Sequence, residues 1–257
     1  MAAVPIGALR LSGEFAAMAV DVSRAMPRRP FQFREFVEQA WFIASVTIMP
    51  TILVSIPFGA VISLQVGQLT GQLGAQSFAG ASAVLAVVRE AAPIAAALLI
   101  AGAAGSAICA DLGSRKIREE IDAMEVLGVN PIPRLVVPRV FGAMFVAFWL
   151  NGLVITAGIA GGYFFHVVIQ NGSAGAYLSS FTALATMPDL YVSLIKSVIF
   201  AWLAAIVGSY KGLTAGGGPK GVGQAVNESV IVSFMILFMV NAIASAIYFQ
   251  VIPPRGL

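Results

Sequence analysis

Residues 89–139 decide the fold of this chain: REAAPIAAALLIAGAAGSAICADLGSRKIREEIDAMEVLGVNPIPRLVVPR. An arginine and a glutamate open the stretch, residues 91–110 carry no charge, and charged residues return from residue 111 onward. A helix needs about 20 apolar residues to cross the hydrocarbon core of a bilayer. The stretch therefore predicts a transmembrane helix over residues 91–111, followed by a loop in water.

The whole chain shows the same scarcity of charge. Apolar residues make up 59% of the 257 residues and charged residues 11%, against roughly 25% charged residues in a soluble domain. Charge is also absent from residues 39–88, 140–188 and 229–254. These features exclude a cytosolic globule, and the net charge of +3 is no sign of nucleic-acid binding. We expect an all-α integral membrane protein with five transmembrane helices, at residues 41–65, 91–111, 138–165, 190–210 and 225–251.

An N-terminal arm, residues 1–40, precedes the domain of residues 41–257 that holds the spans. Apolar residues in 11–26 recur at steps of three or four, which predicts an amphipathic helix in the membrane interface. The alternative is a soluble helix that packs on a partner. The arm also carries cationic and aromatic residues that suit the headgroup level: Arg28, Arg29, Arg34, Phe31, Phe33 and Phe36.

The distribution of lysine and arginine predicts the orientation. Twelve of the fifteen basic residues fall on the side of the N-terminus, and short cytoplasmic loops are enriched in such residues. We expect a cytoplasmic N-terminus in the plasma (inner) membrane, with the C-terminus outside. The glycine-rich residues 214–223 predict a flexible cytoplasmic turn.

The loop after the second span predicts a short amphipathic helix. Ile117, Ile121 and Met124 have the spacing of one helical face, and Gly128 and Pro131 are expected to end the helix. A second face is acidic and consists of Glu119, Asp122 and Glu125. Such a helix suits docking on a cytosolic partner, but it can equally rest on lipid headgroups.

Four charged residues lie at or inside the ends of the spans. Arg89 and Glu90 stand directly before the second span, whose first turn suits Pro93. Lys196 lies inside the fourth span and Asp189 nearer its outer end, so Lys196 can snorkel outward or pair with Glu90 or Asp189. Charge within a membrane indicates a functional site by default. A substrate cavity and structural pairing both remain open.

Small residues at four-residue spacing let membrane helices approach closely. The second and third spans hold such residues, and either intramolecular packing or a dimer contact would use them: Gly102, Gly105, Ser106, Gly158 and Gly162.

The sequence also argues against an enzyme. Cys109 and His166 are the single cysteine and histidine, which excludes an internal disulfide and the usual His- and Cys-rich metal sites. No GxxxxGK[ST] phosphate loop occurs. We expect no catalytic residue, metal site or bound cofactor. An ion channel is disfavoured because the charges are too few to line a continuous pore.

Residues 89–139 resemble the signature region of the MlaE/YrbE permease family. The shared features are the Arg-Glu pair, the AGAAGSA span, the acidic-Gly pair and the terminal Pro-Arg. IKSVIFA at residues 195–201 and GVGQAVNESVIVSF at residues 221–234 also resemble the family, and several strings look closest to actinobacterial YrbE proteins encoded with Mce proteins. One departure is Ala91-Ala92-Pro93, where many relatives have Leu-Gly-Pro.

The resemblance implies a five-span permease subunit of an ABC-type Mce lipid transporter, which imports a fatty acid, sterol or phospholipid. Its implied partners are a cytosolic ATPase dimer that uses ATP and Mg, a second and non-identical YrbE-type permease, and MCE-domain proteins outside. Residues Arg89, Glu90, Asp189 and Lys196 would line a lipid cavity or pair within the bundle. A non-transporting scaffold for MCE proteins and an intramembrane lipid-modifying enzyme are the alternatives. ATPase coupling would fall to Glu119, Glu120, Asp122, Met124, Glu125, Leu127 and Gly128.

Overall fold

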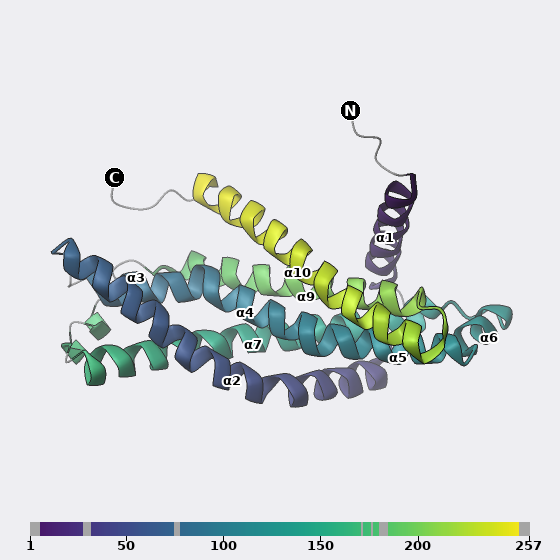
Figure 1. Ribbon diagram of the computed structural model, residues 1–257, viewed down its shortest axis with the longest axis horizontal. Helices are drawn as coiled ribbons and strands as arrows, with labels where there is room; N and C mark the ends of the chain where they lie inside the picture. Colours follow the sequence, from purple (N-terminus) through teal and green to yellow (C-terminus); the bar gives the residue numbers. More distant parts are fainter. Residues whose placement is uncertain are drawn as a thin grey trace. The chain divides into compact units, whose positions relative to one another are not determined.

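The computed structural model describes residues 6–27, 32–74, 78–170, 172–175, 177–179 and 185–251, and within these ranges it contains helices and no strand. Five helical segments of the described chain are long and apolar enough to span a membrane (Figure 1). They are Phe33–Gln72, Ala79–Ile117, Ile132–Ile169, Met187–Leu213 and Gly218–Tyr248. The prediction of an all-α membrane protein with five spans is confirmed.

The N-terminal helix α1 (Ile6–Ala25) precedes the spans. Met18 and Val22, which the helical spacing places on its apolar face, are buried. Helix α1 packs against Tyr210 of α9 (Met187–Leu213). The Tyr210 ring lies edge-on to that of Phe15, and the Tyr210 hydroxyl lies 3.2 Å from a carboxylate oxygen of Glu14. The predicted anchors Arg28, Arg29 and Phe31 lie outside the described residues.

The first and last spans begin earlier than predicted. Helix α2 (Phe33–Gln72) includes Arg34, which pairs with Glu38 one turn later and so extends the helix beyond the apolar stretch. Helix α10 (Gly218–Val251) begins inside the predicted turn, so the expectation of a turn over residues 218–223 was wrong. Gly217 and Gly218 adopt positive φ angles, which lets the chain reverse within a short turn before Pro219 in the first helical turn.

The second span is longer than predicted and contains π-helical turns. It comprises α3 (Ala79–Ala86), η2 (Val87–Ala91), α4 (Ala92–Leu99), η3 (Ile100–Gly105) and α5 (Ser106–Ile117). Arg89 and Glu90 therefore lie inside the helix and not before it, and the placement of Pro93 at a helix start was wrong. The chain continues through Pro93 because wider π turns accommodate a residue without an N–H.

The predicted loop helix exists but is shorter. Helix α5 ends at Ile117, Glu119 adopts a left-handed φ of 59°, and α6 covers Glu120–Val126. Because of this break, Ile117 does not share a helical face with Ile121 and Met124, contrary to the prediction. After α6, Gly128 has a φ of 74°, and the N–H of Val129 donates to the carbonyl of Met124 in a Schellman ending.

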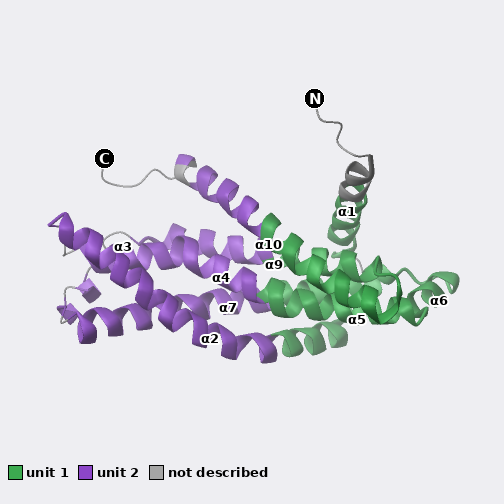
Figure 2. Cartoon of the chain, in the orientation of Figure 1, with its two compact units in different colours: residues 1–43, 100–144, 201–236 green, residues 44–99, 145–200, 237–257 purple. Residues whose placement is uncertain are grey.

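Two compact units divide the chain (Figure 2). Unit 1 comprises Met1–Ile43, Ile100–Met144 and Ala201–Ile236, and unit 2 comprises Ala44–Leu99, Phe145–Phe200 and Leu237–Leu257. Each of the five long helices contributes residues to both units. The predicted division into residues 1–40 and 41–257 stays a prediction.

Glycines let backbones meet within each unit. In unit 2, a Cβ on Gly59 of α2 would overlap the carbonyl of Gly158 of α7 (Val137–Phe164), and one on Gly162 would lie 3.2 Å from the carbonyl of Gly59. In unit 1, a Cβ on Gly208 of α9 would lie 2.6 Å from the carbonyl of Gly105. The approaches at Gly59 and Gly208 require glycine, and the one at Gly162 is tight for any larger residue.

Two of the predicted small residues make no such contact. A Cβ on Gly102 would meet nothing within 4 Å among the described residues. The hydroxyl of Ser106 donates to the carbonyl of Gly102, 2.5 Å away in the same helix.

Candidate functional site

A buried cluster of charged residues occupies unit 2. The guanidinium Nε of Arg89, in η2, lies 2.6 Å from Oδ1 of Asp189, at the start of α9. The second carboxylate oxygen of Asp189 accepts hydrogen bonds from the backbone N–H of Thr186 at 2.8 Å and from its hydroxyl at 2.7 Å. The hydroxyl of Tyr248, on α10, donates to Asp189, and Arg89 lies 5.2 Å from the centroid of the Tyr248 ring. The Asp189 carboxylate thus ties η2, α9 and α10 together.

A second ion pair lies beside the first. Lys196 of α9 has its Nζ 3.3 Å from Oε1 of Glu90, so Lys196 pairs with Glu90 and not with Asp189. Ser245 accepts a hydrogen bond from Lys196 at 3.0 Å and donates one to Glu90 at 2.8 Å. Asn241 donates to the other oxygen of Glu90 at 3.0 Å. Both charged groups thereby find polar partners inside an apolar helix bundle.

The backbone carbonyl of Arg89, four residues before Pro93, is a further partner of Lys196. Proline has no N–H, so it cannot donate to the carbonyl four residues earlier in the helix, which is that of Arg89. Lys196 Nζ donates to this carbonyl at 3.2 Å. The proline and the lysine therefore act as a pair, although the sequence pattern suggested only a helix start.

The four charges of this cluster neutralise one another. Arg89, Glu90, Asp189 and Lys196 are all the Asp, Glu, Lys and Arg residues among the described residues of unit 2. They form two ion pairs, each between one cation and one carboxylate. Pairing offsets much of the desolvation cost that a lone buried charge would impose.

Sequence reasoning missed the contribution of α10 to this cluster. Asn241, Ser245 and Tyr248 follow the spacing i, i+4, i+7, which places them on one face of a helix. Three polar side chains at this spacing in an apolar span could have indicated from the sequence that α10 contributes to the cluster.

At the α5–α6 junction, basic residues pair with carboxylates of the segment that was predicted to carry an acidic docking face. Arg118 Nε lies 2.8 Å from Oε1 of Glu120, and Lys116 pairs with Asp122. The hydrogen bond and charge of Arg118 lower the pKa of the Glu120 carboxyl below its usual value. Protonation would therefore remove this ion pair only as the pH falls through that lowered pKa. One carboxylate of the predicted face, that of Asp122, and the neighbouring carboxylate of Glu120 are thus paired with cations of the preceding turns.

The end of α6 exposes apolar side chains instead. Val126 is 88% exposed and Leu127 is 79% exposed. Both lie outside the spans, where large exposed aliphatic groups often mark an interaction site.

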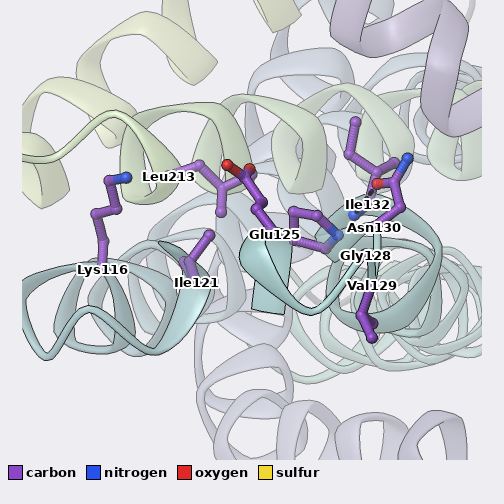
Figure 3. A pocket seen from close by; sticks show the side chains of 9 residues that line it. Lys116, Ile121, Glu125, Gly128, Val129, Asn130, Ile132 and Leu213 are labelled. Atoms are coloured by element: carbon purple, nitrogen blue, oxygen red, sulfur yellow. Dashed lines mark hydrogen bonds between the residues drawn. The ribbon is translucent and has the colours of Figure 1, made fainter. Parts of the chain in front are cut away.

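A pocket of about 510 Å³ lies beside this helix, within unit 1 (Figure 3). Ile121 and Glu125 of α6, Lys116 of α5 and Leu213 of α9 line it. The remaining lining comes from the turn after α6, including Gly128. Met124 is half-buried on α6, and Glu119 holds the break before this helix.

Comparison with known proteins places the chain in a family. The family described as Permease MlaE matches residues 36–247. A probable ABC transporter permease protein of Synechocystis sp. is 34% identical over 192 residues, covering 75% of this chain and 73% of that protein. Another probable ABC transporter permease protein, of Rickettsia bellii, is 28% identical over 239 residues, covering 93% and 92%. A third, of Pyropia yezoensis, is 31% identical over 214 residues, covering 83% of this chain and 81% of that protein. The family predicted from residues 89–139 is confirmed, and the chain belongs to the MlaE permease family.

Proposed function

We propose that the chain is the permease subunit of an ATP-driven, ABC-type transporter whose cargo is a lipid. Its relatives are named as ABC transporter permeases. The sequence carries no phosphate-loop motif, so a separate cytosolic ATPase dimer would hold ATP and Mg. A second, non-identical permease and outer MCE-domain proteins complete the complex that the Mce-type resemblance suggests, with import as its direction.

The main support for a lipid cargo is that the charged residues described in unit 2 pair with one another. A permease for a polar solute needs charged or polar groups that are open to that solute. The described part of unit 2 has four charged residues, and each of them is paired with another. Its spans also expose large apolar side chains, among them Leu53, Phe145 and Trp149, which suit contact with acyl chains or a sterol.

The same geometry favours a structural role for the cluster, in which it holds helices together, over direct binding of the transported lipid. Asp189 and Lys196 of α9 are buried, and their helical partners come from η2 and α10. Glu90, whose side chain is 39% exposed, is the member best placed to meet a bound lipid.

The orientation follows from the positive-inside rule. The twelve basic residues used to predict topology all belong to the chain segments of unit 1. We infer that the loops of unit 1 and the N-terminus are cytoplasmic and the C-terminus is outside the plasma membrane.

Helix α6 is the proposed contact with the ATPase. It stands between two spans on the cytoplasmic side of this topology, and the Lys116–Asp122 and Arg118–Glu120 pairs tie it to α5. A push on the exposed Leu127 would therefore reach the second span. The apolar end of α6 and Gly128 replace the acidic face as the main docking feature.

The transport proposal is tested by reconstituting the complete complex in proteoliposomes. We expect a labelled fatty acid, sterol or phospholipid to stimulate ATP hydrolysis and to cross the membrane only with ATP. A complex that assembles but hydrolyses ATP independently of all three lipids would indicate the scaffold alternative. Covalently altered lipid in the mass spectrum would indicate the enzyme alternative. Either result contradicts the proposal.

A further inference from the structure

The pocket beside α6 contains a carboxylate that no cation among the described residues neutralises. Glu125 is exposed, lines this pocket of about 510 Å³, and makes no ion pair with the described part of the chain. In Figure 3 the Glu125 carboxylate lies apart from the ammonium group of Lys116. The Lys116 Nζ pairs instead with Asp122. The pocket therefore offers an accessible negative charge to a group from outside the chain.

The surroundings of the pocket add to this negative charge. Residues 116–128 hold two basic and four acidic residues, and both basic residues already have carboxylate partners within the same stretch. Helix α6 also ends beside the pocket, with Gly128 in the lining. The C-terminal end of a helix carries a partial negative charge that favours cations. The pocket thus suits a positively charged group.

Most of the pocket wall is apolar. Ile121 of α6 and Leu213 of α9 line it, together with Val129, Pro131 and Ile132. Lysine and arginine carry their charge at the end of a long aliphatic stem, which packs on apolar surface while the charged end stays with a polar partner. A small inorganic cation would gain nothing from these apolar groups. The wall therefore favours a basic side chain as the occupant.

Exposed aliphatic side chains next to the pocket indicate that the basic side chain comes from a protein. Val126 and Leu127 directly follow Glu125 in the chain and are largely exposed. Apolar contacts around a charged group exclude water from it, as in the energetically dominant parts of protein–protein interfaces, where arginine is enriched. The excess of negative charge would also repel the anionic lipids of a cytoplasmic leaflet.

We propose that this pocket receives an arginine or lysine side chain of the cytosolic ATPase. Its charged end pairs with Glu125, and its stem packs on Ile121 and Leu213. Val126 and Leu127 contact the ATPase surface beside this pair. Because α6 is the proposed ATPase contact, the pairing rests on the function proposed above, and it adds the chemistry of the ATPase residue that enters the permease.

Affinity purification of the assembled complex in detergent tests the pairing, with the co-purified ATPase measured by quantitative mass spectrometry. We expect Glu125→Arg to lower the amount of ATPase per permease roughly tenfold, because two positive charges would then meet in the pocket. Glu119→Arg is the matched control. Glu119 is also exposed, makes no ion pair with the described residues and does not line the pocket, so this variant should retain most of the ATPase.

Charge reversal on the ATPase identifies the partner residue. Among ATPase variants in which one arginine or lysine is replaced by glutamate, at least one should restore the complex with Glu125→Arg and weaken the complex with the parent chain. If none restores it, the pairing is overturned.

Three further results would also contradict the pairing. Retention of the ATPase by Glu125→Arg, or an equal loss in Glu119→Arg, would remove the pairing but leave the proposed function standing, because the parent chain still binds the ATPase. Loss of bound phosphatidylethanolamine from Glu125→Arg, with the ATPase retained, would assign the pocket to an ammonium headgroup. Absence of any ATPase from the parent complex would refute the proposed function and the pairing together.

Discussion

At the scale of single residues, the pairing of Glu90 with Lys196 makes a prediction about stability. Glu90→Gln leaves Lys196 buried and charged without its carboxylate, so the midpoint of thermal unfolding in detergent should fall. The loss should stay below the roughly 3–5 kcal/mol of a fully buried pair, because the Glu90 side chain is 39% exposed. Adding Lys196→Met to Glu90→Gln should restore much of the midpoint.

The control for this residue is an exposed ion pair. Arg34 and Glu38 pair at the surface of α2, where such pairs contribute little. Arg34→Gln should leave the unfolding midpoint unchanged. A fall of equal size in Arg34→Gln and Glu90→Gln would refute the special role of the buried pair.

The sequence could identify the charged residues of this cluster but not their partners. Charge at or inside the ends of apolar spans singles out Arg89, Glu90 and Lys196 without any structure. The choice between Glu90 and Asp189 as the partner of Lys196 depends on how α9 packs against η2, which no local pattern encodes. The hydrogen bond from Lys196 to the carbonyl of Arg89 is recognised only when the helix is seen to continue through Pro93.

At the scale of elements, a residue in the left-handed conformation lies at each end of α6: Glu119 before it and Gly128 after it. Gly128→Ala places a side chain where φ is 74°, which should cost about 1 kcal/mol and disturb the end of α6, so less ATPase should co-purify. Glu119→Gly should keep or improve co-purification, since it relieves a φ of 59° and removes a carboxylate that the structure places at the break. Quantitative immunoblots of the purified complex measure both variants.

The matched control is Gly102→Ala, because Gly102 lies in a helix with open space around its would-be Cβ. This variant should leave co-purification unchanged. Loss of the ATPase in Glu119→Gly with retention in Gly128→Ala would show that the carboxylate docks and that the shape of the turn does not matter.

The elements themselves were predictable because apolar stretches long enough to span a bilayer are unmistakable in sequence. Their ends were not, since α2 starts among charged residues stabilised by an i, i+4 pair and α10 starts inside a glycine turn. The break at Glu119 was also hidden, because the spacing of Ile117, Ile121 and Met124 fits one uninterrupted helix. Local backbone conformation, not hydrophobicity, decided these boundaries.

At the scale of the whole molecule, the division of charge makes a prediction about topology. The segments of unit 1 hold the twelve basic residues that indicate a cytoplasmic side, while the charges described in unit 2 cancel. One span, Ala79–Ile117, separates Leu73 from Leu127 along the chain, so the two residues should lie on opposite sides of the membrane. They are 80% and 79% exposed, which makes them equally accessible labelling sites.

In a Cys109→Ala background, Leu73→Cys should react with a membrane-impermeant maleimide in intact cells, and Leu127→Cys only after lysis. Labelling of both before lysis would contradict the single crossing, and labelling of Leu127→Cys alone would reverse the orientation. The parent chain is the control, because its lone Cys109 is buried and should stay unlabelled.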